Sequence, residues 1–247
     1  MSQRTAIVTG VDSGLGGAIS QRLARDGAAV AVFDVNGDAA KEAAASIEAA
    51  GGTALGLTVD VTDRAAISGA VDEVRSRLGR PTILVNSARA ERSDAFLDIS
   101  PETWDLLLAV NLTGTFNCCQ AVLPDMIEER WGRVVNITSS SMQSGAPRMA
   151  HYVAANSGVL GLTKCLALEF GPDGITVNTI PPGFIDTPIL RAVFEAASRD
   201  VEEGVATVPV RRIGTPEDVA ATCAFLVSEE AGYLTGQLIG LNGGRNT

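Results

Sequence analysis

A hydroxyl and a phenol stand thirteen residues apart near the middle of the chain, at Ser139 and Tyr152. The apolar run Arg133–Thr138 predicts a strand before the serine, and His151–Phe170 predicts a long helix that carries the tyrosine. A phenol can exchange a proton with an alcohol or ketone only if its pKa falls from about 10 towards the working pH. Asn156, four residues on and on the same helix face, occupies the position where a cation would favour the phenolate. Asparagine can form hydrogen bonds there, but it brings no charge.

A glycine turn near the start of the chain has the spacing of a phosphate site. Gly10, Gly14 and Gly16 follow the apolar run Thr5–Thr9 and precede an amphipathic stretch, Ala18–Asp26. Glycines at a strand-to-helix turn let the backbone approach a pyrophosphate, and the helix N-terminus directs free N–H groups at it. The sequence therefore predicts a dinucleotide site at this turn. The other turn residues expected to contact the cofactor are Asp12, Ser13 and Leu15.

Two aspartates at strand ends suit the adenosine half of such a cofactor. Asp34 ends the apolar run Ala28–Asp34, where a carboxylate can accept hydrogen bonds from both ribose hydroxyls and repels a 2′-phosphate. Asp60 follows the run Thr53–Val59 and can accept a hydrogen bond from the adenine amino group. The negative charge of Asp12 in the turn also disfavours a further phosphate. We therefore predict NAD as the cofactor, with NADP less favoured.

The elements that must position these groups alternate between strand and helix patterns along the whole chain. Continuous apolar runs separated by helical stretches predict a parallel sheet covered on both faces. The expected fold class is α/β: a single doubly wound Rossmann domain over residues 1–247, with about seven parallel strands and helices on both faces. Within it, the long irregular excursion over residues 181–215 predicts a substrate loop or lid. The expected strands are Thr5–Thr9, Ala28–Asp34, Thr53–Val59, Thr82–Asn86, Arg133–Thr138, Ile175–Ile180 and Gln237–Leu241.

The bulk composition restricts the partners and the compartment. The 247 residues carry a formal net charge of −10, which argues against nucleic acid and anionic membrane surfaces as partners. Four cysteines without paired metal-ligand spacing and a single histidine, His151, lead us to expect no metal. Neither a secretory leader nor an apolar run approaching about 20 residues is visible in the sequence. We therefore expect a cytoplasmic protein without a membrane span.

In order and spacing, these motifs resemble the short-chain dehydrogenase/reductase family over nearly the whole chain. The matching segments are Thr9–Gly16 for T-G-x-x-x-G-x-G, Asp60-Val61 for the D-V adenine pair, Asn111 in V-N-L-T-G, Ser139 in N-I-T-S, Tyr152, Asn178–Thr187 for N-x-I-x-P-G-x-x-x-T, and Leu234–Gln237 with Asn242–Gly244 for the closing L-T-G-Q…N-G-G. The resemblance implies an oxidoreductase that moves a hydride between a nicotinamide dinucleotide and a CH–OH group.

The resemblance also implies roles for individual residues. Ser139 would hold the substrate oxygen, Tyr152 would transfer the proton, and Asn111 would order a water or the helix backbone in a proton relay. Asn156 would take the place of the family's lysine on the nicotinamide ribose. Because family members are commonly homotetramers, we expect a homotetramer or a homodimer. The remaining residues that the family's pattern assigns to the cofactor are Val61, Asn86, Ala88, Pro182, Gly183, Ile185 and Thr187.

Two positions depart from the family's pattern, and both lie beside the expected cofactor. The family reads Y-x-x-x-K where this chain runs from Tyr152 to Asn156, and N-N-A-G where it has N-S-A-R at Asn86–Arg89. Lys164 lies about 18 Å beyond Tyr152 along the helix and cannot replace the missing lysine. Arg89 is the better candidate for a replacement cation. We favour the alternative, in which Arg89 points to solvent or obstructs the cofactor.

Three functions are compatible with these residues. The favoured one is an NAD(H)-dependent oxidoreductase that acts on a small apolar secondary alcohol or ketone. A lyase similar to halohydrin dehalogenases, which keep the serine and tyrosine and replace the lysine with arginine, ranks lower because those proteins lack the nucleotide glycines. The third is a catalytically impaired member of the family, natural or engineered, that has lost its lysine. The side chains expected to form an apolar wall of the substrate pocket are Phe184, Ile189, Leu190, Val193 and Phe194.

Overall fold

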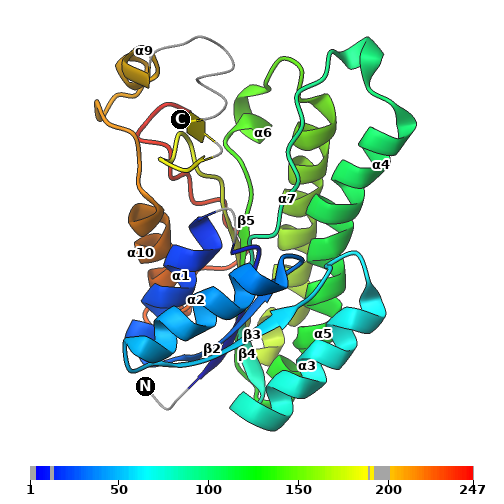
Figure 1. Ribbon diagram of the computed structural model, residues 1–247, viewed down its shortest axis with the longest axis vertical. Coiled ribbons are helices and arrows are strands. Elements are labelled where there is room, and N and C mark those ends of the chain that lie inside the picture. Colours follow the sequence, from blue (N-terminus) through cyan, green and yellow to red (C-terminus); the bar gives the residue numbers. More distant parts are fainter. Residues whose placement is uncertain (1–3, 12–13, 189, 192–200, 247) are drawn as a thin grey trace.

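Six parallel strands form a sheet at the centre of the computed structural model, which describes residues 4–11, 14–188, 190–191 and 201–246 (Figure 1). Their order is β3-β2-β1-β4-β5-β6, and every neighbouring pair is parallel. The order reverses between β1 and β4, and a crevice at the C-terminal ends of such strands is where α/β sheets bind ligands. The predicted α/β class is confirmed. The strands are β1 (Thr5–Thr9), β2 (Ala29–Asp34), β3 (Thr53–Thr58), β4 (Pro81–Asn86), β5 (Gly132–Ile137) and β6 (Ile175–Ile180).

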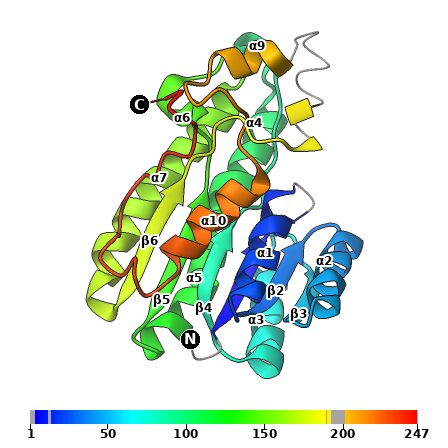
Figure 2. The same cartoon turned by 90° about the vertical axis from the view of Figure 1, so that its left-hand side faces the viewer.

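Helices cover both faces of this sheet (Figures 1 and 2). One face carries α1 (Leu15–Arg25), α2 (Gly37–Ala49) and α10 (Pro216–Leu226). The other carries α3 (Arg64–Leu78), α5 (Gly114–Glu128) and α7 (Ala150–Phe170). The shorter helical segments are η1 (Phe96–Asp98), α4 (Pro101–Leu108), η2 (Ala109–Thr113), α6 (Ser141–Ser144), η3 (Gly171–Asp173) and α9 (Val201–Ala206).

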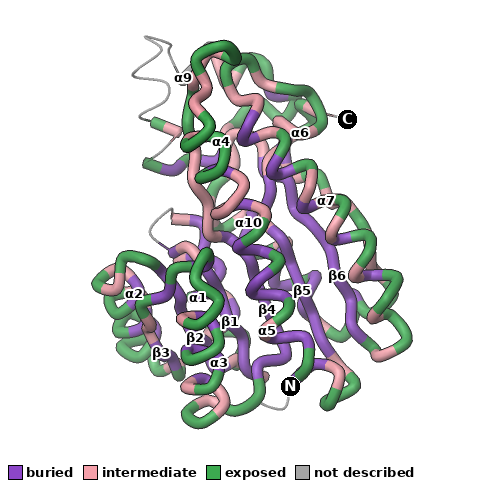
Figure 3. Tube along the Cα trace, turned by 90° about the vertical axis from the view of Figure 1, so that its right-hand side faces the viewer, coloured by how far each residue is buried: buried purple, intermediate pink, exposed green. Residues whose placement is uncertain are grey.

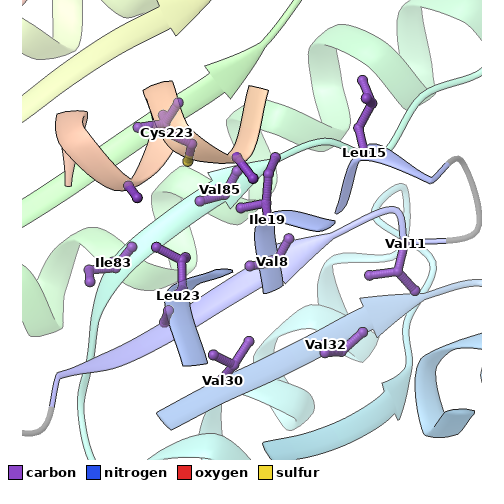
Figure 4. Close-up of a cluster of buried hydrophobic side chains, with 14 of the residues drawn as sticks. Val8, Val11, Leu15, Ile19, Leu23, Val30, Val32, Ile83, Val85 and Cys223 are labelled. Atoms are coloured by element: carbon purple, nitrogen blue, oxygen red, sulfur yellow. The ribbon is translucent and has the colours of Figure 1, made fainter. Parts of the chain in front are cut away.

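Side-chain alternation along the strands explains why the strands read as continuous apolar runs. Val8 of β1 and Val30 of β2 pack with Ile19 of α1 (Figure 4). Ile7 and Phe33 are instead buried on the opposite face. Successive residues of a strand point to opposite faces, so a sheet covered on both sides needs apolar residues at every position. Figure 3 shows β1, β2, β4, β5 and β6 buried along almost their whole length, whereas the edge strand β3 is buried only at Ala54 and Leu55.

The first helix begins three residues earlier than the sequence pattern predicts, at Leu15 instead of Ala18. Gly14 caps it with φ 87°, a left-handed conformation that glycine adopts without a steric penalty. The first turn of a helix has N–H groups without intrahelical partners. These groups therefore face the glycine turn, where the sequence predicts a pyrophosphate.

The prediction of a seventh strand at Gln237–Leu241 is wrong. The segment runs beside β6 and pairs with this part of the chain only through two isolated bridges. Pro181 and Pro182, which continue β6, have no N–H to donate to a ladder. The Asn178 side chain also accepts the backbone N–H of Gln237 at 3.1 Å. A regular ladder is therefore interrupted, and the described sheet has six strands.

A continuous helix of 28 residues runs from Pro101 to Glu128 and includes α4, η2 and α5. Ser100 caps it, since its Oγ accepts the N–H of Thr103 at 3.1 Å and proline follows at the first helical position. By length and composition it is the one helix of the described residues that could cross a membrane, which the sequence analysis did not anticipate. Half of its most apolar window is buried inside the molecule, against α3 and the sheet.

Candidate active site

A cleft of about 380 Å³ opens at the C-terminal edge of the sheet. Its walls come from the start of α1, the loops after β4, β5 and β6, the start of α7, and the C-terminal segment. Figure 1 shows α6, α9 and the C-terminus gathered at this end of the molecule. The lining includes Leu15, Arg89, Glu91, Ser139, Tyr152, Phe184, Thr187 and Arg245.

The serine and the tyrosine selected from the sequence face this one cleft. Ser139 is the second residue after β5, a strand anchored by Val134 on one face of the sheet and Val135 on the other. Its hydroxyl lies 2.9 Å from the hydroxyl of Ser141. Tyr152 lies in the first turn of α7 with only 4% of its surface exposed. A strand end and a helix start thus present a hydroxyl and a nearly buried phenol to the same space.

Burial dominates the acidity of the phenol and raises the pKa of Tyr152 above its ordinary value, because it penalises the charged phenolate. The positive charge of Arg89 lowers this pKa and the carboxylate of Glu91 raises it. Hydrogen bonding from Ser139 and Asn156 lowers it by smaller amounts. The phenol is therefore protonated at neutral pH and is ready to donate a proton.

Asn156 is buried on α7, where its Nδ2 donates to the backbone carbonyl of Tyr152 at 2.9 Å. The side chain thus folds back on its own helix, four residues towards the N-terminus. It brings a dipole, and no charge, to the position where the resemblance implies a lysine ammonium group. Its predicted contact with the nicotinamide ribose stays a prediction.

Asn111 holds the loop after β4. It lies in the π-helical turn η2, and its carboxamide makes two hydrogen bonds with the backbone of Ala90. Oδ1 accepts the Ala90 N–H at 3.0 Å, and Nδ2 donates to the Ala90 carbonyl at 2.9 Å. The sequence predicts a role in ordering a water or the helix backbone, and the observed contact is instead with the neighbouring loop. Turns of this kind are frequent at functional sites.

His151, which the sequence left without a clear role, fastens the far end of the same loop. Its ring is fully buried, and Nδ1 accepts the backbone N–H of Tyr152 at 2.8 Å. The other nitrogen lies 3.2 Å from the Asp94 carboxylate, so the tautomer that satisfies both contacts carries its proton on Nε2. The histidine therefore ties Asp94 to the first turn of the helix that carries the phenol.

The glycine turn has the close backbone packing that a dinucleotide cradle needs. A Cβ on Gly10 would lie 2.3 Å from Cα of Ala88, and one on Gly16 would lie 2.5 Å from the carbonyl oxygen of Gly10. Only residues without side chains fit there, and the space they leave adjoins the N-terminus of α1. The residues present therefore fit a pyrophosphate. Asp12 and Ser13 lie outside the described residues.

Asp34 is buried at the end of β2. Oδ2 accepts the N–H of Val11 at 2.7 Å, and Oδ1 accepts the N–H of Asn36 at 2.8 Å. The carboxylate thus steadies the glycine turn, at the strand end where the sequence predicts the adenosine ribose. Asp60 is exposed, and its Oδ1 accepts from both the N–H and the hydroxyl of Thr62. Val61 is buried next to it.

Asn86 turns away from the cleft. Its Nδ2 donates to Oδ1 of Asn136 at 2.8 Å, and Asn136 donates in turn to the hydroxyl of Thr163. Asn86 is not among the residues that line the cleft, and its Oδ1 is buried without a hydrogen-bond partner. Its side chain belongs to a polar network inside the fold, so a contact with the cofactor would have to come from its backbone.

The segment after β6 supplies the remaining wall. Pro182, Gly183, Ile185 and Thr187 all line the cleft, as the resemblance implies. Of the expected apolar wall, Phe184 and Leu190 line it as well, whereas Ile189, Val193 and Phe194 lie outside the described residues.

Charged residues that the sequence analysis did not assign to the pocket also reach it. The Arg245 guanidinium stacks over the Phe184 ring at 4.0 Å from its centre, and Glu91 stands near the phenol. Arg89 lines the cleft with its Nε buried, so it does not point away from the site, and the other half of the favoured interpretation, that it obstructs the cofactor, stays a prediction. No local pattern marks Arg245, because its approach depends on how the C-terminal segment passes over the sheet edge.

Comparison with known proteins gives consistent matches over the full length. A family model described as enoyl-(acyl carrier protein) reductase matches residues 10–246. The chain is 38% identical to the (2S)-[(R)-hydroxy(phenyl)methyl]succinyl-CoA dehydrogenase subunit BbsD of Thauera aromatica, over 100% of this chain and 98% of that protein. It is 38% identical to the acetoacetyl-CoA reductase of Cupriavidus necator, over 99% and 98% of the two chains. A crystal structure from Sinorhizobium meliloti, described as a short-chain alcohol dehydrogenase, superposes with a TM-score of 0.93 at 34% identity and covers 99% and 97% of the two chains.

Proposed function

The chain belongs to the short-chain dehydrogenase/reductase family, and from this membership we propose that it transfers a hydride between NAD(H) and a secondary alcohol or its ketone. The relatives bear the names of dehydrogenases and reductases, which supports an oxidoreductase acting on CH–OH. The observation that carries the proposal is the shared cleft: Leu15 beside the glycine turn and the pair Ser139 and Tyr152 line the same space.

The chain's own residues act on the substrate oxygen. Ser139 donates a hydrogen bond to that oxygen and orients it towards the phenol. In reduction, Tyr152 gives its proton to the oxygen as the carbonyl becomes an alcohol, and in oxidation the phenolate takes the proton back. The low exposure of Tyr152 keeps bulk water from competing for this proton.

The glycine turn and Asp34 would hold the cofactor. Gly10, Gly14 and Gly16 give the pyrophosphate access to backbone N–H groups, and Asp34 accepts the ribose hydroxyls. When bound, the nicotinamide supplies the hydride acceptor for oxidation and the hydride donor for reduction. A buried carboxylate at Asp34 supports NAD over NADP, because a 2′-phosphate would bring a second negative charge next to it.

The names of two relatives suggest a substrate class. Acetoacetyl-CoA reductase and the 3-oxoacyl-[acyl-carrier-protein] reductase of Thermotoga maritima, 36% identical to this chain over 98% of its length, act on oxo groups of acyl thioesters. Phe184 and Leu190 offer an apolar wall for an acyl chain. We propose a secondary alcohol or ketone with an apolar body, with residues 181–215 as the substrate loop or lid.

We also propose a cytoplasmic homotetramer or homodimer that pairs α5 and α7. Leu168 on α7 is 83% exposed and Phe116 on α5 is 39% exposed. An interface built from these two helices would cover both side chains. We propose that each subunit folds as one domain over residues 1–247.

Fluorescence titration of the purified protein with NADH and NADPH tests the proposed function. We expect NADH to bind at least about tenfold more tightly than NADPH, with turnover of a ketone panel that includes 3-oxoacyl thioesters. Binding without turnover on any ketone would favour the impaired family member. Absence of dinucleotide binding would contradict the oxidoreductase and leave the non-redox lyase as the better account.

Asp34→Asn is expected to shift the cofactor preference at least about tenfold towards NADPH. The amide has the shape of the carboxylate and can still accept one of the two backbone N–H groups, but it no longer repels a 2′-phosphate. The measurement is the ratio of the NADH and NADPH dissociation constants. The exposed Asp60→Asn serves as the matched control, and we expect it to leave that ratio within about twofold. An unchanged ratio in Asp34→Asn would contradict the role given to this carboxylate.

Alcohol oxidation is expected to accelerate with pH, whereas ketone reduction stays nearly level. Burial raises the pKa of Tyr152, so below that pKa the phenolate fraction rises about tenfold per pH unit while the protonated phenol stays dominant. Oxidation needs the phenolate and reduction needs the phenol, which fixes the sign of both effects. Measuring kcat/KM in both directions up to about pH 9 checks this. A plateau of the oxidation rate below about pH 7 would contradict a raised pKa.

A further inference from the structure

A buried phenol that must become a phenolate needs a positive charge nearby, and Asn156 supplies none. We propose that the guanidinium of Arg89 is this charge and that it acts through Tyr152, in place of the lysine found in related enzymes. The inference rests on the proposed function, since a proton donor and acceptor is needed only if the substrate oxygen reacts. It assigns a purpose to both departures from the family's pattern, the asparagine on α7 and the arginine after β4.

The loop that carries Arg89 is fixed on both sides. Before it, the N–H groups of Ser87 and Ala88 both donate to Oγ1 of Thr9, each at 3.1 Å. After it, Asn111 holds the backbone of Ala90 with two hydrogen bonds. A side chain between two anchored residues begins from a defined backbone position. The fold therefore sets the backbone position from which Arg89 reaches the cleft.

The guanidinium is not neutralised by a carboxylate of the described residues. Several arginines form ion pairs there, such as Arg75 with Asp125 and Arg212 with Asp218, whereas none of these pairs includes Arg89. Its Nε is buried and has no hydrogen-bond partner. A charge on a half-buried side chain acts more strongly on its neighbours than one fully in water.

The groups facing the phenol have opposing effects. Burial and the Glu91 carboxylate disfavour the phenolate, and Arg89, Ser139 and Asn156 favour it. Among the three favourable groups, Arg89 has the largest effect on the pKa of Tyr152. Without the charge of Arg89, only the neutral groups of Ser139 and Asn156 would favour the phenolate, and the Glu91 carboxylate would still disfavour it.

The two tyrosines of the chain permit a direct test without cofactor or substrate. Tyr233 is fully exposed, so Tyr233→Phe leaves Tyr152 as the sole phenol to follow by ultraviolet absorbance during a pH titration. In that background we expect Arg89→Gln to raise the ionisation midpoint of Tyr152 by about one pH unit or more. Arg92→Gln is the matched control, because Arg92 lies in the same loop but is exposed and does not line the cleft. Equal midpoints in the two variants would overturn the proposal.

A double-mutant cycle with Asn156→Lys tests the same inference by activity. We expect Arg89→Gln to lower kcat/KM for alcohol oxidation at neutral pH by about tenfold or more in the natural chain. With a lysine at position 156, Arg89→Gln should lower kcat/KM much less, because the lysine then supplies the positive charge that favours the phenolate. Equal losses in both backgrounds would overturn the proposal. So would an Arg89→Gly variant that binds NADH more tightly and turns over faster, since the arginine would then obstruct the cofactor.

The proposed function and the proposed role of Arg89 can fail separately. If the natural chain binds neither dinucleotide and oxidises no alcohol, the proposed function fails, while the absorbance titration still decides whether Arg89 acts on Tyr152. If the chain is active and the titration midpoints coincide, the function stands and the role of Arg89 is wrong.

Discussion

Tyr152→Phe is expected to lower kcat/KM by roughly 10²–10⁴-fold in both directions while NADH affinity stays within about twofold. The substitution removes one oxygen and keeps the ring that fills the start of α7, so the packing of this nearly buried side chain is preserved. What disappears is the only group in the cleft proposed to exchange a proton with the substrate oxygen. Because position 156 carries asparagine, that side chain has no ammonium group with which to protonate the oxygen through water.

Steady-state kinetics with the preferred ketone and fluorescence titration with NADH measure the two expected quantities. Tyr233→Phe removes the same atom from a fully exposed ring and serves as the control, with kcat/KM expected within about twofold of the natural chain. Ser139→Ala should retain more activity than Tyr152→Phe, since it loses a hydrogen bond to the substrate and keeps the proton donor. A Tyr152→Phe enzyme with kcat/KM within about threefold of the natural one would exclude the phenol from proton transfer.

Gly16→Ala is expected to weaken dinucleotide binding by at least about tenfold and to lower the free energy of unfolding by about 1–3 kcal/mol. Its Cβ would lie 2.5 Å from the carbonyl oxygen of Gly10 and 3.1 Å from Cα of Val11. Both neighbours are backbone atoms and cannot rotate away, so the glycine turn itself must move. Gly16 is not among the residues with positive φ, and the effect therefore reports crowding without backbone strain.

The next residue offers a matched control for this crowding. Among the described residues, the nearest neighbour of a Cβ on Gly17, also in α1, would be the carbonyl oxygen of Val11 at 3.7 Å. Gly17→Ala should therefore raise the free energy of unfolding by about 0.5–1 kcal/mol, as alanine does within helices, and leave NADH binding within about twofold. Denaturant unfolding and fluorescence titration of both variants measure these values. Equal NADH affinities for Gly16→Ala and Gly17→Ala would contradict the role of the close turn.

Six of the seven expected strands could be read from the sequence because their information is local. A strand buried on both faces needs an apolar residue at every position, and the run at Ile83–Val85 shows this directly: Ile83 and Val85 enter one core and Leu84 enters the other. The helix start at Ser100-Pro101 is equally local, since the cap and the proline act on their own turn. The seventh strand failed because pairing depends on its neighbour, and that neighbour continues into two prolines.

The sequence by itself determined the residue types of the candidate site: the glycines of a phosphate turn, a serine, a phenol, and an asparagine where related enzymes carry a lysine. Spacing along one strand or one helix suffices for such statements, because the backbone geometry of each element is fixed. The tertiary structure decided which groups meet. It brought Thr9 against Ser87, Asn111 against Ala90 and Arg245 over Phe184, and it turned Asn86 inward and Arg89 into the cleft. These contacts join residues from different elements, so they follow from strand order and loop packing, which no local pattern specifies.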